Sequence, residues 1–159
     1  MAEPTARQTP GTITVLSLSP VENDHAALER TFRDSSLTLY PNCRLALQPS
    51  RTLALALAAL REYRIPIVLC DGDGQPEAWR EILQATREMP APPCVIVTSR
   101  LADDRRWAEL LQEGAFDLLC KPFDQSSVMR SIHSAWVHWQ NRYGVTETAG
   151  ECQEPAPGT

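Results

Sequence analysis

The sequence contains no hydrophobic run long enough to cross a membrane. Its longest candidate is LALALAALREY, in which charged residues begin directly after Leu60, whereas a membrane-spanning helix needs about 20 apolar residues. The N-terminal residues also lack the pattern of a secretory signal peptide. We therefore expect a cytoplasmic protein that does not enter a membrane.

Positive charge is also scarce. The 159 residues include 15 Lys and Arg against 20 Asp and Glu, which gives a formal net charge of −5. Such a chain offers no broad positive field to a phosphate backbone, so we expect no nucleic-acid binding and favour protein partners. The five cysteines are odd in number and no pair has metal-site spacing, which predicts reduced thiols.

Large apolar residues are rare at both ends of the chain, where Pro, Gly, Thr and Glu predominate. Segments of this composition bury too little apolar surface to offset the entropy lost on ordering. We therefore predict disordered tails at residues 1–11 and 143–159. The remaining residues, 12–142, have the length and composition of one globular domain.

Short apolar runs alternate with amphipathic segments inside this domain. Strands are predicted at residues 12–18, 43–48, 65–71, 94–99 and 116–120, each followed by a helix, with a loop at 35–42. Ser19 and Ser50 are the predicted N-caps of the first two helices. Five such units predict a doubly wound α/β fold, in which helices cover both faces of a parallel sheet.

Folds of this class carry their functional residues at the carboxyl ends of the strands. The polar residues at those positions are Ser17, Ser19, Asp71, Asp73, Thr98, Ser99 and Lys121. Asp71 in IVLCD, Thr98 in VIVTS and Lys121 in CKPFD follow an order that resembles the receiver domain of bacterial response regulators, over residues 12–142. The resemblance implies the flavodoxin-like (βα)5 fold of CheY, with strand order 2-1-3-4-5 and two helices on one face and three on the other.

The resemblance also implies a function. A partner histidine kinase would transfer a phosphoryl group to Asp71, Lys121 would pair with the new charge, and Thr98 would turn its hydroxyl toward a phosphate oxygen. The bond before Pro122 would be cis. These residue types suit the chemistry, because an acyl phosphate needs a carboxylate nucleophile, a cation and a hydroxyl that contacts the product. The chain would then be a stand-alone response regulator in two-component signal transduction, and not an enzyme.

The end of the first predicted strand departs from the receiver pattern. Receivers carry two adjacent acidic residues there, which hold magnesium, and this sequence has Ser17 and Leu18. Asp71 and Asp73 remain as candidate metal ligands. Because magnesium requires several hard oxygen ligands, we expect weak magnesium binding or none, and phosphorylation that is weak or independent of metal.

Three functional classes stay open at this point: a phosphorylatable receiver, a pseudo-receiver that acts through protein contacts without phosphate, and a flavodoxin-like binder of a small ligand. The last is disfavoured, because SLSPVEND after the first strand has no glycine for a phosphate loop. Trp107 and Trp136, on the fourth and fifth predicted helices, fit either the core or a homodimer interface. His25, His133 and His138 are predicted on solvated helix faces.

Overall fold

The computed structural model describes residues 12–34, 44–101 and 103–144. The predicted loop at 35–42 and the predicted tails lie outside these residues, apart from residues 143 and 144. In chain order, the elements are β1 (Thr12–Leu18), α1 (Glu22–Asp34), β2 (Arg44–Ser50), α2 (Leu53–Glu62), β3 (Ile67–Asp71), α3 (Ala78–Thr86), β4 (Cys94–Ser99), α4 (Asp104–Gln112), β5 (Asp117–Cys120) and α5 (Gln125–Tyr143).

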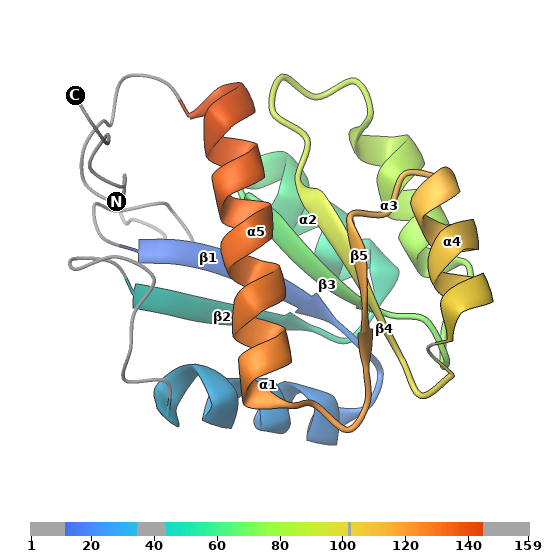
Figure 1. Ribbon diagram of the computed structural model, residues 1–159. Coiled ribbons are helices and arrows are strands. Elements are labelled where there is room, and N and C mark those ends of the chain that lie inside the picture. Colours follow the sequence, from blue (N-terminus) through green and yellow to red (C-terminus); the bar gives the residue numbers. More distant parts are fainter. Residues whose placement is uncertain (1–11, 35–43, 102, 145–159) are drawn as a thin grey trace, which may run out of the picture.

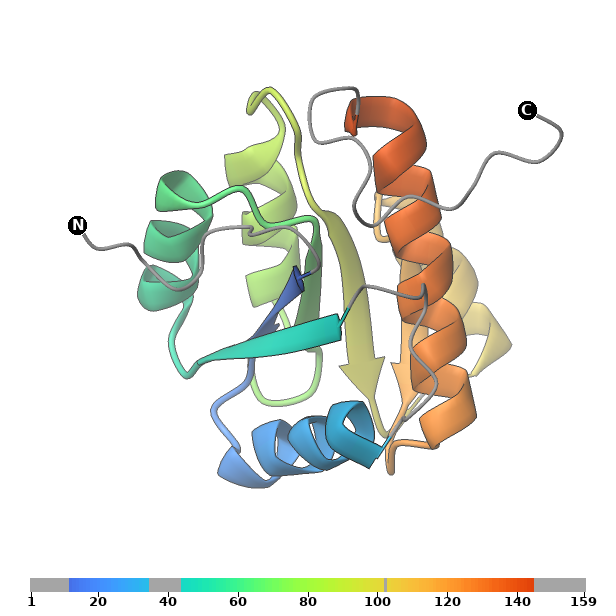
Figure 2. The same cartoon turned by 90° about the vertical axis from the view of Figure 1, so that its left-hand side faces the viewer.

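The five strands form one parallel sheet in the order β2-β1-β3-β4-β5. Figure 1 shows this sheet with α5 in front of it and α2 behind it, and Figure 2 shows the same layers from the side. The predicted fold class and strand order are therefore confirmed. The carboxyl ends of β1, β3, β4 and β5 meet at one edge of the sheet, as parallel strands require.

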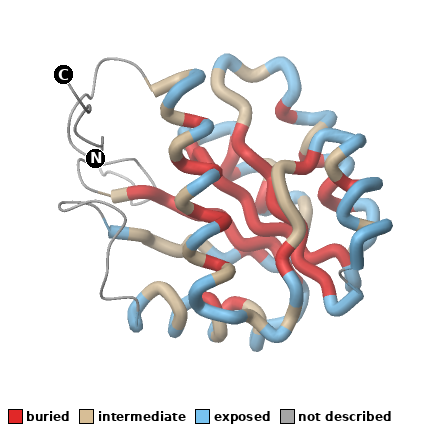
Figure 3. Tube along the Cα trace, viewed as in Figure 1, coloured by how far each residue is buried: buried red, intermediate tan, exposed pale blue. Residues whose placement is uncertain are grey.

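The core consists of two layers, one on each face of the sheet, because successive strand residues point to opposite faces. Every residue of β3 and β4 is buried, and Figure 3 shows these strands in red between half-buried helices. One layer joins the sheet to α1 and α5 and includes Val15, Ile67, Ile96, Leu28 and Ile132. The other layer, which includes Leu18, Val68, Ala56, Ile82 and Leu110, joins it to α2, α3 and α4. Two helices thus cover one face and three the other, as predicted.

Both predicted helix caps are wrong. Helix α1 begins at Glu22, three residues after Ser19, and the Ser19 hydroxyl accepts from Val21 N at 3.1 Å. Helix α2 is capped by Thr52, whose hydroxyl accepts from Leu55 N at 3.2 Å. Ser50 instead ends β2 and is buried, and its carbonyl accepts from Ser19 N. The two serines therefore contact each other at the carboxyl ends of β1 and β2 and do not cap helices.

None of the helices within residues 12–34, 44–101 and 103–144 combines the length and apolar character needed to cross a bilayer. The cysteines in these ranges, Cys70, Cys94 and Cys120, are free thiols, as predicted. Burial raises the pKa of the Cys70 and Cys94 thiols to about 12. These two thiols are therefore protonated and unreactive at neutral pH.

Candidate functional site

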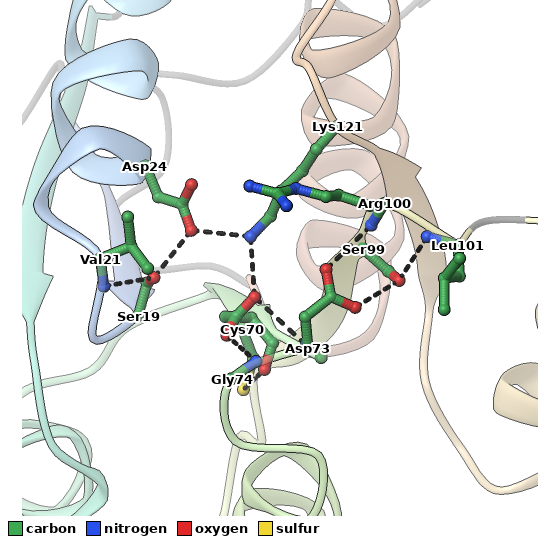
Figure 4. A network of polar contacts seen from close by, with 12 residues as sticks. Ser19, Val21, Asp24, Cys70, Asp73, Gly74, Ser99, Arg100, Leu101 and Lys121 are labelled. Carbon is green, nitrogen blue, oxygen red and sulfur yellow. Dashed lines mark hydrogen bonds and ion pairs between the residues drawn. The ribbon is translucent and has the colours of Figure 1, made fainter.

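A lysine between two carboxylates forms the centre of the candidate site. Lys121 follows β5, Asp71 ends β3, and Asp24 lies in the first turn of α1. Lys121 Nζ donates to Asp71 Oδ1 and to Asp24 Oδ2, both at 2.7 Å, and Figure 4 shows it pointing toward Asp24. The side chains of Lys121, Asp71 and Asp24 are only 10%, 2% and 14% exposed. We call this arrangement the Lys121 bridge.

The electrostatics of the bridge keep Lys121 charged. Burial disfavours the ammonium form, but the hydrogen bonds and charges of Asp24 and Asp71 outweigh it and raise the pKa of the Lys121 amine above its ordinary value. The lysine is therefore a fixed cation at the carboxyl edge of the sheet at neutral pH.

The loop after β3 holds the Asp71 carboxylate in place. Asp71 Oδ1 accepts from Asp73 N at 3.2 Å, and Oδ2 accepts from Gly74 N at 2.6 Å. A Cβ atom at Gly74 would lie 2.9 Å from Asp71 Oδ2, so this close approach requires glycine. Both oxygens of Asp71 therefore have hydrogen-bond donors before any ligand arrives.

Asp73 connects the same loop to the end of β4. Its Oδ1 accepts from the Ser99 hydroxyl at 2.7 Å, and its Oδ2 accepts from Arg100 N at 2.9 Å. Partial burial opposes ionisation of Asp73, but these two hydrogen bonds and the charges of Lys121 and Arg106 outweigh it and lower the pKa of the carboxyl. Asp73 is therefore ionised. Figure 4 shows its carboxylate hydrogen-bonded to Ser99 and Arg100 at the end of β4.

A buried histidine organises the corner between β1 and α1. The prediction that His25 lies on a solvated face is wrong, since the residue is only 3% exposed. Its Nε2 lies 3.0 Å from the Ser19 carbonyl, which only accepts, so Nε2 carries the proton; Nδ1 lies 3.0 Å from Ser17 Oγ. The Ser19 hydroxyl in turn donates to Asp24 Oδ2 at 2.7 Å. The corner thus fixes Asp24 against Lys121.

The structure brings two of the three predicted site residues into contact. Asp71 and Lys121 form an ion pair, and the peptide bond from Lys121 to Pro122 is cis, as the resemblance implied. Thr98 is buried and is the register partner of Asp71, and its carbonyl accepts from Gly72 N at 2.8 Å. The role of the Thr98 hydroxyl in reading a phosphate stays a prediction.

The sequence did not reveal Asp24 as a site residue, and it gave no role to Ser99. Asp24 belongs to α1, yet the first turn of a helix that follows a strand lies beside the carboxyl edge of the sheet. That position was the available signal. Ser99 stands among the strand-end residues, and its hydroxyl contacts an acidic side chain of the site.

The residues at the site do not fit a divalent metal ion. Ser17 Oγ is engaged by His25, and Leu18 is 1% exposed within the apolar layer. Lys121 Nζ occupies the space between Asp24 and Asp71, where a cation would need to bind. Among the residues that the structure describes, no group of three or more His, Cys, Asp or Glu is arranged to hold a metal.

Comparisons with known proteins show the fold. A response regulator from Thermotoga maritima has a TM-score of 0.65 and 19% identity, covering 78% of this chain and 97% of that one. The beryllofluoride-activated NtrC4 receiver domain dimer has a TM-score of 0.65 and 18% identity, covering 79% of this chain and 98% of that one. An atypical orphan response regulator with a phosphorylation-independent regulatory mechanism has a TM-score of 0.60 and 12% identity, covering 80% of this chain and 98% of that one. No protein-family model and no curated protein sequence matches this chain. The chain therefore has the CheY-like fold of response regulator receiver domains.

Proposed function

We propose that this chain is an atypical receiver domain of two-component signal transduction, with Asp71 as its phosphoacceptor. Phosphorylation of Asp71 is slow and independent of metal, because the chain lacks the acidic pair at Ser17 and Leu18 and provides its own cation. In this role the protein is a signalling component and not an enzyme, and its partner is a histidine kinase or another signalling protein.

The observation that carries this proposal is the Lys121 bridge. Phosphoryl transfer to a carboxylate requires positive charge beside the reacting group, because negative charge on the incoming oxygens must be offset. Lys121 Nζ lies 2.7 Å from Asp71 Oδ1 and so supplies this charge. The same contact makes transfer slow, since Asp71 must release a strong hydrogen bond before it attacks phosphorus.

A second candidate function is a pseudo-receiver that signals through protein contacts without phosphate. It is favoured by the three hydrogen bonds that the Asp71 carboxylate already accepts, from Lys121, Asp73 N and Gly74 N. The atypical orphan response regulator, whose mechanism does not depend on phosphorylation, supports the same alternative by likeness of fold.

Partner contacts in either case are proposed on α4 and α5. Trp107 of α4 is 46% exposed, and its indole donates to Asp117 Oδ1 at 3.2 Å, so the indole nitrogen is held while nearly half of the residue stays accessible. Trp136 is only 6% exposed and stacks on Trp139, which assigns it to the core. A homodimer through α4 and α5 is consistent with the receiver dimer among the similar structures.

Phosphorylation of wild type and Asp71→Asn with acetyl phosphate, followed by intact mass spectrometry, tests the proposal. We expect slow addition of one phosphoryl group to wild type, equal with magnesium or with a chelator, and none to Asp71→Asn. Fast labelling that requires magnesium would contradict the proposed mechanism. Complete absence of labelling, together with loss of partner binding in Trp107→Ala, would establish the pseudo-receiver.

A further inference from the structure

A cavity opens directly onto the Lys121 bridge. It has a volume of about 420 Å³ and lies between α1 and the loop after β5, lined by Asp24, Ala27, Arg100, Lys121, Pro122 and Phe123. This volume exceeds the space that a phosphoryl group needs. The cavity therefore gives a small anionic group access to Lys121 and Asp24, and Asp71 lies directly behind Lys121.

Arg100 brings a second positive charge to this cavity. Its backbone N–H donates to Asp73 Oδ2 at 2.9 Å, which fixes the residue at the end of β4. Figure 4 shows the guanidinium pointing toward Asp24, and Asp24, Arg100 and Lys121 line the same cavity. No carboxylate within residues 12–34, 44–101 and 103–144 forms an ion pair with this guanidinium. Among these residues, its planar set of donors is therefore not taken up by a carboxylate.

The charge on the bridge shows why a second cation is needed. Lys121 already compensates Asp24 and Asp71, so one positive charge faces two negative ones before an anion enters. A phosphoryl group adds further negative charge, and the residues do not fit a metal ion that would offset it. Arg100 is the cation that lines the cavity in addition to Lys121, and a guanidinium matches phosphate geometry with two parallel hydrogen bonds.

We infer that Arg100 binds the incoming phosphoryl group and supplies the second positive charge for phosphorylation of Asp71, an inference that rests on the proposed function. In the step, an Asp71 oxygen forms a bond to phosphorus as the bond from phosphorus to the acyl oxygen of an acyl phosphate breaks. The acyl carboxylate leaves with the electron pair, and no proton or redox partner is required. Arg100 holds the oxygens of the transferring group while Lys121 stays beside Asp71.

The test compares wild type, Arg100→Ala and Arg100→Lys in a chelator, with acetyl phosphate as donor. We expect the labelling rate to fall about tenfold or more in Arg100→Ala, the effect of one lost charged hydrogen bond. Arg100→Lys restores part of the rate, because lysine keeps the charge without the paired donors. Arg105→Ala is the matched control, since Arg105 is exposed on α4 and pairs with Glu109. It is expected to label at the wild-type rate.

A second measurement separates this inference from the proposed function. Binding of acetylphosphonate, which cannot transfer its phosphorus, is followed by NMR in wild type and Arg100→Ala. Binding to wild type that is weakened about tenfold in the variant supports the Arg100 site even if Asp71 is never labelled. Labelling of Arg100→Ala at the wild-type rate overturns the inference and leaves the proposed function intact. Equal acetylphosphonate binding in both proteins, or no binding to either, also overturns it.

Discussion

Two cations in this chain each bridge two carboxylates, one inside the protein and one on its surface. Lys121 contacts Asp24 and Asp71 at 2.7 Å, with a side chain that is 10% exposed. Arg80 of α3 contacts Glu77 at 2.9 Å and Glu113 at 2.6 Å, with a side chain that is 45% exposed. The contact distances of the two cations are similar. The two bridges differ in how far they are buried and in the residues that surround them.

Burial decides what each bridge contributes. Around Arg80, water screens the charges and replaces any contact that is lost, so an exposed pair stabilises by about 0.2 to 1 kcal/mol. Around Lys121, loss of the cation leaves two carboxylates facing each other with little access to water, which costs roughly 3 to 5 kcal/mol at a well-buried site. The Lys121 bridge therefore has a structural role in addition to its proposed chemical one.

The largest expected effect is the loss of Lys121. Lys121→Met keeps the apolar part of the side chain and removes the charge, so we expect the free energy of unfolding to fall by about 3 kcal/mol. Arg80→Met, its surface counterpart, is expected to cost less than about 1 kcal/mol. Urea unfolding followed by circular dichroism measures both. Similar small losses in the two variants would show that burial does not distinguish the bridges.

The next effect concerns the support behind the buried bridge. His25→Ala leaves Ser17 Oγ and the Ser19 carbonyl without their partner at a buried corner, and we expect a loss of about 2 kcal/mol. His138→Ala is the control, because His138 is exposed on α5 and surface changes stay within about 0.5 kcal/mol. Urea unfolding gives both values. A His25→Ala protein as stable as His138→Ala would exclude a role for His25 in fixing the corner.

Loss of one carboxylate is expected to have a smaller effect. Asp24→Asn preserves the shape of the side chain and leaves Lys121 paired with Asp71, so we expect a loss of about 1 to 2 kcal/mol. Glu113→Gln makes the corresponding change beside Arg80 and is expected to cost below about 0.5 kcal/mol. Thermal and urea unfolding of the two variants provide the comparison. A larger loss of stability in Glu113→Gln than in Asp24→Asn would show that the Arg80 contacts, and not the Lys121 bridge, stabilise the fold more.

The smallest effect is a gradual dependence of stability on alkaline pH. The folded state raises the pKa of Lys121, so its contribution is fully present below the unfolded value of about 10.4. That contribution is lost as the pH rises through the higher folded pKa. Wild type should therefore lose stability over this range relative to Lys121→Met in urea titrations. A constant difference between the two proteins would mean that the folded state does not raise this pKa.

The sequence predicted the sheet and its strand order because the strand residues carry strong local signals. The run IPIVLCD is apolar without interruption, and CVIVTS repeats the same pattern, so both runs predict strands that are buried on two faces. Asp71 and Lys121 follow such runs directly. Their meeting at one edge of the sheet then follows from the topology.

The rest of the site depends on contacts that no local pattern encodes. In the sequence, Asp24 and His25 are ordinary residues of an amphipathic helix. Only the packing of α1 against β1 directs Asp24 toward Lys121 and His25 into the protein. Which of the two hydroxyls, that of Thr98 or that of Ser99, contacts an acidic side chain of the site depends in the same way on the direction in which β4 ends. These features are tertiary, which is why propensity and periodicity do not reveal them.

The most direct test of the central claim, that Lys121 occupies the place of a metal ion, uses the fact that Lys121 is the only lysine in the sequence. Selective ¹⁵N labelling of lysine then gives one side-chain ammonium signal in NMR spectra. We predict a slowly exchanging signal at neutral pH, as expected of a buried ammonium held by Asp24 and Asp71, and no change on addition of millimolar magnesium. A signal lost to rapid exchange, or one that shifts saturably at sub-millimolar magnesium in wild type but not in Asp71→Asn, would contradict the claim.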